Sequence, residues 1–172
     1  MPTPSQAFTY VGPDDIRAAV VRSGAAGRAV RWPDDVRDWL EGTGPAEREE
    51  PFTYVVDPGG TLLLAPRRSE HAACAGGGPV LAAGEIAFAP REDGGSEVSE
   101  VGNQSTGYCP DPEASWPALA AALDRAGLAR TGWFTRAVVL RHGPRCRERN
   151  LVNDGDFTCA LCDAPLPRRP GR

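Results

Sequence analysis

The sequence contains no lysine, so all 19 of its basic residues are arginine. A GC-rich coding genome explains this bias more simply than any chemical function does. The 23 acidic residues outnumber the basic ones and give a formal net charge of −4. The chain as a whole is therefore not a polycation that binds nucleic acid through net charge. From Arg136 onward the balance reverses, because eight Arg face only four acidic residues.

Two kinds of targeting segment are also missing. No run of about 18 apolar residues could span a membrane. Residues 1–15 lack the charged start and the apolar core of a secretory signal. The five cysteines are an odd number, which without an export signal favours reduced thiols or metal ligands over a disulfide framework. We therefore expect a cytoplasmic protein that does not bind a membrane.

The chain of 172 residues is long enough for one core with a small appended module. It contains 20 Gly and 17 Pro, which predict many turns and short elements. We expect an α+β domain over residues 1–141, with a helical N-terminal part at 1–45 and a sheet with one helix at 52–141. Residues 142–172 are expected to form a separate module with a basic tail.

The apolar pattern predicts helices first and strands afterwards. Two segments at 13–24 and 33–44 begin with Pro-Asp-Asp, which suits the first turn and the positive end of a helix. In the first helix, Ile16, Ala19 and Val20 are spaced to form an apolar stripe facing the core. Further elements are expected as strands at 52–57, 61–66, 80–89, 97–101 and 133–141, and as a helix at 115–126 with Ser115 as its N-cap. Hairpin-joined strands with helices outside them predict an α+β fold around a mainly antiparallel sheet.

The C-terminal segment "HGPRCRERNLVNDGDFTCALCDAPLP" carries three cysteines at metal-ligand spacing. Cys159 and Cys162 form a CxxC pair, and Cys146 precedes them across a stretch that suits a small hairpin with Asp154 and Gly155 at its tip. These residues resemble a zinc ribbon, in which two knuckles close one tetrahedral site.

The segment departs from the zinc-ribbon pattern at one ligand. A ribbon with four Cys would have its first Cys at position 143, where Gly143 stands. The neighbouring His142 is the candidate fourth ligand, so we expect structural Zn²⁺ bound by Cys146, Cys159, Cys162 and His142. The alternative is a degenerate ribbon held together by packing alone, with three ordinary thiols. If His142 points away, water could occupy the fourth position.

Two polar loops of the β region are candidate binding sites. Loop 67–77 is rich in groups that bind ligands or transfer protons, and loop 103–109 contains amides and hydroxyls between two glycines. Glu85 interrupts an apolar strand, and alternation favours its pointing outward. The predicted ligand-binding residues are Arg67, His71, Glu85, Asn103, Gln104, Ser105 and Thr106. A purely structural connection is the alternative for loop 103–109.

The sequence therefore predicts a zinc-binding recognition protein, which binds a protein partner or a small ligand through loops 67–77 and 103–109. One alternative is a cysteine-dependent enzyme with Cys109 as nucleophile and His71 as base. Another is a nucleic-acid-binding protein that uses the C-terminal Arg cluster of Arg141, Arg145, Arg147 and Arg149.

Overall fold

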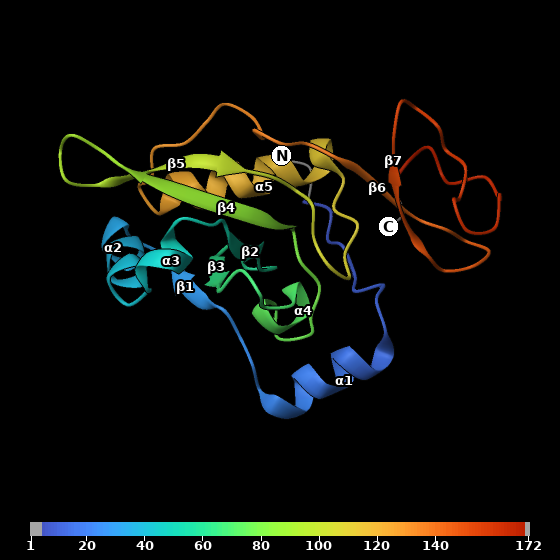
Figure 1. Cartoon of the computed structure of the whole chain (residues 1–172), viewed down its shortest axis with the longest axis horizontal. Helices are drawn as coiled ribbons and strands as arrows, with labels where there is room; N and C mark the ends of the chain where they lie inside the picture. The colour runs from blue at the N-terminus through green and yellow to red at the C-terminus, as the bar shows by residue number, and fades with distance from the viewer. Residues whose placement is uncertain (1–4, 171–172) are drawn as a thin grey trace.

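The computed structural model describes residues 5–170, and over this range it confirms the predicted α+β class with a mainly antiparallel sheet (Figure 1). The first four residues of the predicted helical part and the last two of the predicted basic tail lie outside the described residues. The elements are α1 (Asp14–Ser23), β1 (Arg28–Val30), α2 (Pro33–Glu41), α3 (Pro45–Arg48), β2 (Phe52–Val56), β3 (Leu62–Ala65), α4 (His71–Cys74), β4 (Ala82–Pro90), β5 (Ser96–Val101), α5 (Pro112–Arg125), β6 (Val139–His142) and β7 (Arg149–Val152). None of the helices within residues 5–170 has the length and apolar character needed to cross a membrane.

The main sheet has the strand order β1-β3-β2-β4-β5, and all neighbouring strands are antiparallel. Its central strand β2 is buried at every position, so both faces of the sheet are covered. Tyr54 on one face belongs to the large apolar cluster that contains Leu119 and Leu123 of α5. Val55 on the other face packs in a second cluster with Phe8 and Tyr108. Alternating side chains of one strand therefore serve two cores.

Phe8, α1 and α4 lie on the second face of the sheet, and α5 lies on the first (Figure 1). Phe8 forms an isolated β-bridge with Val80, which ties the start of the described chain to the entry of β4. Helix α1 packs less tightly than its stripe predicts, because Val20 is buried but Ala19 is exposed. The sequence predicted no element at β1 or α3, and the short helix α4 lies within the predicted loop 67–77.

Helix α5 begins three residues before the predicted start. Asp111, and not Ser115, is its N-cap, and the Asp111 carboxylate accepts a hydrogen bond from the Ala114 backbone N–H at 3.2 Å. Pro112 then occupies the first helical position, where the absent N–H costs nothing. The Ser115 hydroxyl instead donates to the Asp111 carbonyl at 2.6 Å.

The predicted strand 133–141 is wrong over its first six residues. Residues 133–138 are irregular, apart from an isolated bridge between Arg136 and Gly102, and regular pairing begins at Val139. Trp133 and Phe134 pack against the Trp116 ring of α5. This aromatic packing takes precedence over strand geometry at that position.

The last strand belongs to a second sheet, formed by β6 and β7 alone. We call residues 139–170 the C-terminal module and residues 5–138 the sheet domain. The hairpin spans the predicted boundary at 141/142, and the division into two domains stays a prediction. Arg141 joins the two parts, because its guanidinium forms a buried ion pair with Asp111 at 3.2 Å. The same side chain donates to the carbonyls of Pro167 and Arg168.

Candidate metal centre and neighbouring cavities

Three thiols come together in the C-terminal module. The sulfurs of Cys146, Cys159 and Cys162 all lie within 4.8 Å of one another, and those of Cys146 and Cys159 are 3.4 Å apart. Four thiolates around Zn²⁺, each with a Zn–S bond of about 2.3 Å, would be separated by roughly 3.8 Å. All five cysteines of the chain are free. The three thiols are therefore spaced to hold a metal ion.

Two turns of the same backbone design present these thiols. In the first knuckle (residues 143–148), the Gly143 N–H donates to the Glu148 carbonyl and the Arg147 N–H donates to the Gly143 carbonyl. In the second knuckle (residues 159–164), Cys159 makes the same two bonds, with Ala164 and with Asp163. The fifth residue of each turn has a positive φ, 61° at Arg147 and 55° at Asp163. Cys146 therefore corresponds to Cys162, and Gly143 corresponds to Cys159.

A side chain at position 143 would reach the thiol cluster. A Cβ atom built on Gly143 would lie 3.4 Å from the Cys146 sulfur and 3.7 Å from the Asn150 Nδ2. Position 143 is therefore where a ribbon with four Cys would have its first ligand, but this chain has glycine there.

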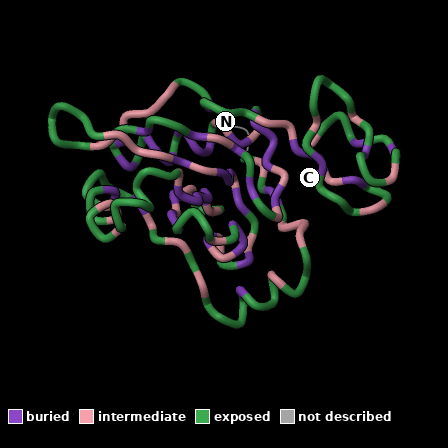
Figure 2. Tube along the Cα trace, viewed as in Figure 1, coloured by how far each residue is buried: buried purple, intermediate pink, exposed green. Residues whose placement is uncertain are grey.

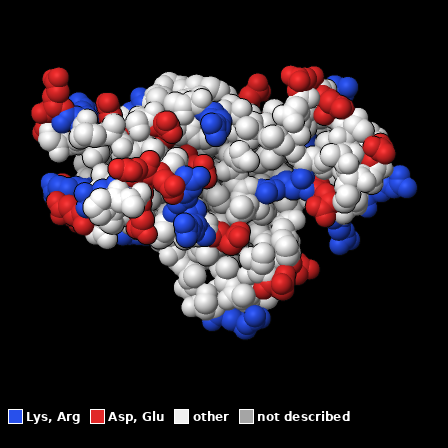
Figure 3. Space-filling view, viewed as in Figure 1, with Lys and Arg blue, Asp and Glu red and all other residues white. Residues whose placement is uncertain are grey.

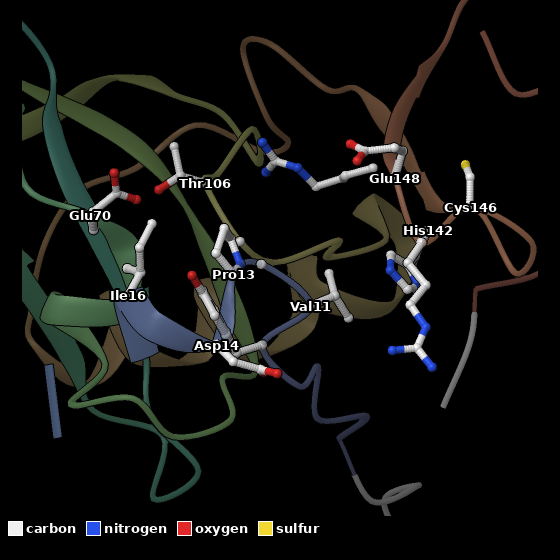
Figure 4. Close-up of a pocket in the computed structure, with 14 residues that line it drawn as sticks. Val11, Pro13, Asp14, Ile16, Glu70, Thr106, His142, Cys146 and Glu148 are labelled. Atoms are coloured by element: carbon white, nitrogen blue, oxygen red, sulfur yellow. The ribbon is translucent and has the colours of Figure 1, made fainter. Parts of the chain in front are cut away.

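His142 does not join the cluster. Within residues 5–170, the group of nearby metal-ligating atoms contains the three Cys sulfurs and no His nitrogen. Figure 4 shows the His142 ring directed away from the Cys146 sulfur. The reason is strand geometry: His142 is the last residue of β6 and pairs with Arg149, one position before the knuckle begins.

Hydrogen-bond donors surround the Cys159 sulfur. The backbone N–H groups of Leu161 and Cys162 lower the pKa of Cys159 to about 6, because they stabilise its thiolate. The Asn150 amide donates to the same sulfur at 3.4 Å, and its carbonyl oxygen accepts from the Ala160 N–H. Asn150 is buried and was missed in the sequence, where only its place between the cysteines could have pointed to it.

His71 is buried and fully engaged. The Thr106 backbone N–H donates to its Nδ1 at 3.1 Å, so the proton is on Nε2, which donates to the Gly84 carbonyl at 2.8 Å. Burial lowers the pKa of His71 to about 4. The His71 ring is therefore neutral, and both of its nitrogens form hydrogen bonds within the protein.

Most side chains of loop 103–109 also bond internally. The Asn103 amide is fully buried, donates to the carbonyls of Pro110 and Val138, and accepts from the Val138 N–H. The Ser105 hydroxyl donates to the Tyr108 carbonyl. Gly84 allows this loop to cross the sheet closely, because a Cβ there would clash with the Gly102 carbonyl oxygen.

The other predicted ligand-binding residues meet at a different place. Arg67, Glu85 and Gln104 line one cavity of about 380 Å³, together with Glu100 and Arg136. Glu85 is half-buried and points out of the core, as its alternation with the buried Ile86 predicts. Of the seven predicted residues, three therefore line this cavity and three are buried, namely His71, Asn103 and Ser105. The seventh, Thr106, is exposed and bonds to His71.

The two bonded nitrogens of His71 have Gly84 and Thr106 as partners, and neither bonds to Cys109. Cys109 lines a cavity of about 170 Å³ with Leu140, Arg141 and His142. Burial raises the pKa of Cys109 to about 11, so the thiol is protonated at neutral pH.

A cavity of about 720 Å³ lies between the sheet domain and the first knuckle (Figure 4). Glu70 and Thr106 line one end, and His142, Cys146 and Glu148 line the other. Asp14 and the residues around Tyr10 form the wall between them. Tyr10, which the sequence did not single out, packs edge-on against Tyr108 at 5.5 Å and covers Gly107.

The C-terminal Arg cluster is not one surface. Arg145, Arg147 and Arg149 are exposed, but Arg141 is buried in its ion pair with Asp111. On the face drawn in Figure 3, positive and negative side chains are interspersed over the molecule.

Comparisons with known proteins give no further assignment. No protein-family model, no curated protein and no solved structure matches the chain.

Proposed function

We propose that the protein is a cytoplasmic zinc-binding recognition protein, in which Cys146, Cys159 and Cys162 hold one structural Zn²⁺. The observation that carries the proposal is the pair of matching knuckles, whose backbones are set for four ligands and carry three cysteines. Thiolate ligands select Zn²⁺ among the common divalent ions, and turns of this kind present them tetrahedrally. The donors around Cys159 favour the thiolate that a metal needs.

The metal has a clear structural task in this proposal. The C-terminal module contains few buried apolar side chains, namely Leu140, Ala164 and Leu166. So small a core gives little stability by itself. A bound ion would fix the first knuckle, which forms one wall of the 720 Å³ cavity.

The cavity suits a protein segment of mixed charge. Arg147 and Arg149 line it on the module side, while Asp14 and Glu70 line it on the other. Glu70, Thr106 and Gly107 come from loops 67–77 and 103–109, through which we propose that the partner is bound. A segment with both acidic and basic side chains would be complementary to these walls.

The state of two residues favours recognition over thiol catalysis. A nucleophilic Cys109 needs a thiolate, whereas its pKa of about 11 keeps the thiol protonated. A base must have a free nitrogen, whereas both nitrogens of His71 are bonded.

Native mass spectrometry of the purified chain tests the metal. We expect one Zn²⁺ per chain, lost in Cys159→Ser and retained in the matched control Cys109→Ser. A metal-free wild type with an ordered C-terminal module would contradict the zinc proposal.

Selection of peptides from a random library tests recognition. Binders should lose affinity when Glu70→Gln or Arg149→Ala is introduced, because each removes a charge from the cavity wall. The control Glu92→Gln, an exposed acid at the β4–β5 turn, should bind as the wild type does. Peptides insensitive to both cavity changes would refute this binding site.

A further inference from the structure

The two knuckles differ at one chemically decisive position. Cys159 supplies a sulfur in the second knuckle, whereas Gly143, at the corresponding position of the first, supplies none. Structural zinc is almost always bound by four protein ligands, and three protein ligands leave the ion with a position for water or another molecule.

Backbone donors are also present at this position. In the second knuckle, the N–H groups of Leu161 and Cys162 donate to the Cys159 sulfur. Their counterparts in the first knuckle are the N–H groups of Arg145 and Cys146. Within residues 5–170, neither of these two N–H groups donates a hydrogen bond to a protein acceptor. By the correspondence of the two turns, both are directed to where a sulfur from position 143 would lie.

We propose that the metal ion keeps one coordination position for a ligand from outside the chain, and that this ligand is a small thiol bound as its thiolate. The proposal rests on the metal binding proposed above. The thiol would release its proton to solvent, and its sulfur would replace a water molecule on the metal. The N–H groups of Arg145 and Cys146 would then donate to that sulfur, as their counterparts donate to Cys159.

The local chemistry favours a thiolate over other donors. The ion already has three sulfur ligands, and soft metals retain soft ligands. The exposed Arg145 and Arg147 belong to the same knuckle, and their positive charges favour an anion there. Among the described residues, no His nitrogen and no carboxylate oxygen joins the three sulfurs as a fourth ligand.

A small molecule can reach the edge of the cluster. Cys146 and Cys162 are partly exposed, whereas Cys159 is buried. Cys146 also lines the large cavity, where Figure 4 places it at the end nearest the module.

Cobalt substitution tests the proposal. The full chain is loaded with Co²⁺, which takes tetrahedral sites like those of Zn²⁺ and has visible absorption bands that report its ligands. 2-Mercaptoethanol is then titrated in. We expect a saturable increase in the sulfur-to-cobalt charge-transfer band of the wild type.

Two substitutions at one position give matched controls. Gly143→Cys should load Co²⁺ with the four-sulfur spectrum from the start and should lose the response to 2-mercaptoethanol. Gly143→Ala adds a Cβ without a donor and should keep the response. The φ of Gly143 is not in the left-handed region, so neither variant is strained by backbone conformation.

The outcomes separate this inference from the zinc proposal. Failure of the wild type to load Co²⁺ or Zn²⁺ would overturn both. Loading without any response to 2-mercaptoethanol would overturn only the outside ligand. A starting spectrum that changes in His142→Ala would identify His142 as the fourth ligand and would likewise overturn it.

Discussion

In the sheet domain, the core is continuous: 17 buried residues form one apolar cluster on the α5 face, and a second cluster covers the opposite face. In the C-terminal module, most of the outer loops are exposed (Figure 2). The module is attached through Arg141 and is organised around three thiols. Burial of apolar surface is the main stabilising term in most domains. The sheet domain buries many apolar side chains, whereas the module buries few. We therefore expect the sheet domain to fold by itself and the module to depend on a bound metal.

Metal removal should produce the largest difference between the two parts. In EDTA we expect the module to unfold while the sheet domain stays folded, because the metal contributes folding free energy only where it binds. Hydrogen exchange with peptide-level readout measures this. Amides at 139–166 should lose their protection, and those of β2 and β4 should keep it. Cys109→Ser serves as a control that retains both patterns in zinc, and global loss of protection in EDTA would break the comparison.

Substitution of Arg141 should produce the next largest effect. Its guanidinium and the Asp111 carboxylate are 6% and 12% exposed, so Arg141→Met leaves a buried carboxylate without its partner. Removal of one partner from a buried pair typically costs about 3–5 kcal/mol. Denaturant unfolding should therefore show a large loss of stability, together with weaker docking of the module.

The exposed Arg145 provides the matched control for this substitution. Arg145→Met changes the same chemical group in the same module, and surface substitutions usually change stability by less than about 0.5 kcal/mol. Equal effects of the two variants would contradict the anchoring role of Arg141.

The sequence predicted the long strands of the main sheet better than the short elements and the irregular segment around them. The strands around β2 alternate or are continuously apolar, and turn residues such as those at 58–60 separate them, so local patterns suffice. Strand β1 is three residues long, and α3 and α4 have four each, too short for any periodic signal. The failed strand at 133–138 has strand-like composition, but the aromatic cluster with Trp116 is a tertiary contact that composition does not encode.

The candidate site was predictable in part for a similar reason. Ligand spacing along the chain marked the three cysteines, because a knuckle is a local structure. The placing of His142 depends on where β6 ends relative to the turn, which a shift of one residue reverses. Two of the bonds of Asn103 join it to Val138, 35 positions away. The same side chain therefore looks like a recognition group in the sequence and a structural one in the fold.

Protonation of His71 should destabilise the sheet domain at low pH, and this effect is independent of the metal. Its folded pKa of about 4 lies below the unfolded value of 6.5, so the folded state binds fewer protons between these values. The contribution of neutral His71 is fully present above pH 6.5 and is lost as the pH falls toward 4. The loss reaches about 3 kcal/mol, because each tenfold change in proton affinity corresponds to about 1.36 kcal/mol.

Denaturant unfolding between pH 4 and 7 isolates this contribution when wild type and His71→Gln are compared. Glutamine can still donate to Gly84 and accept from Thr106, but it does not titrate, so the His71→Gln curve should be flatter by the amount that His71 contributes. His142→Gln removes the other histidine, which lies outside the core, and should keep the wild-type slope. Acid also removes metal from thiolates in all three proteins, so the difference between their slopes belongs to the sheet domain. Identical slopes for wild type and His71→Gln would show that the buried ring does not contribute to the pH dependence of the unfolding free energy.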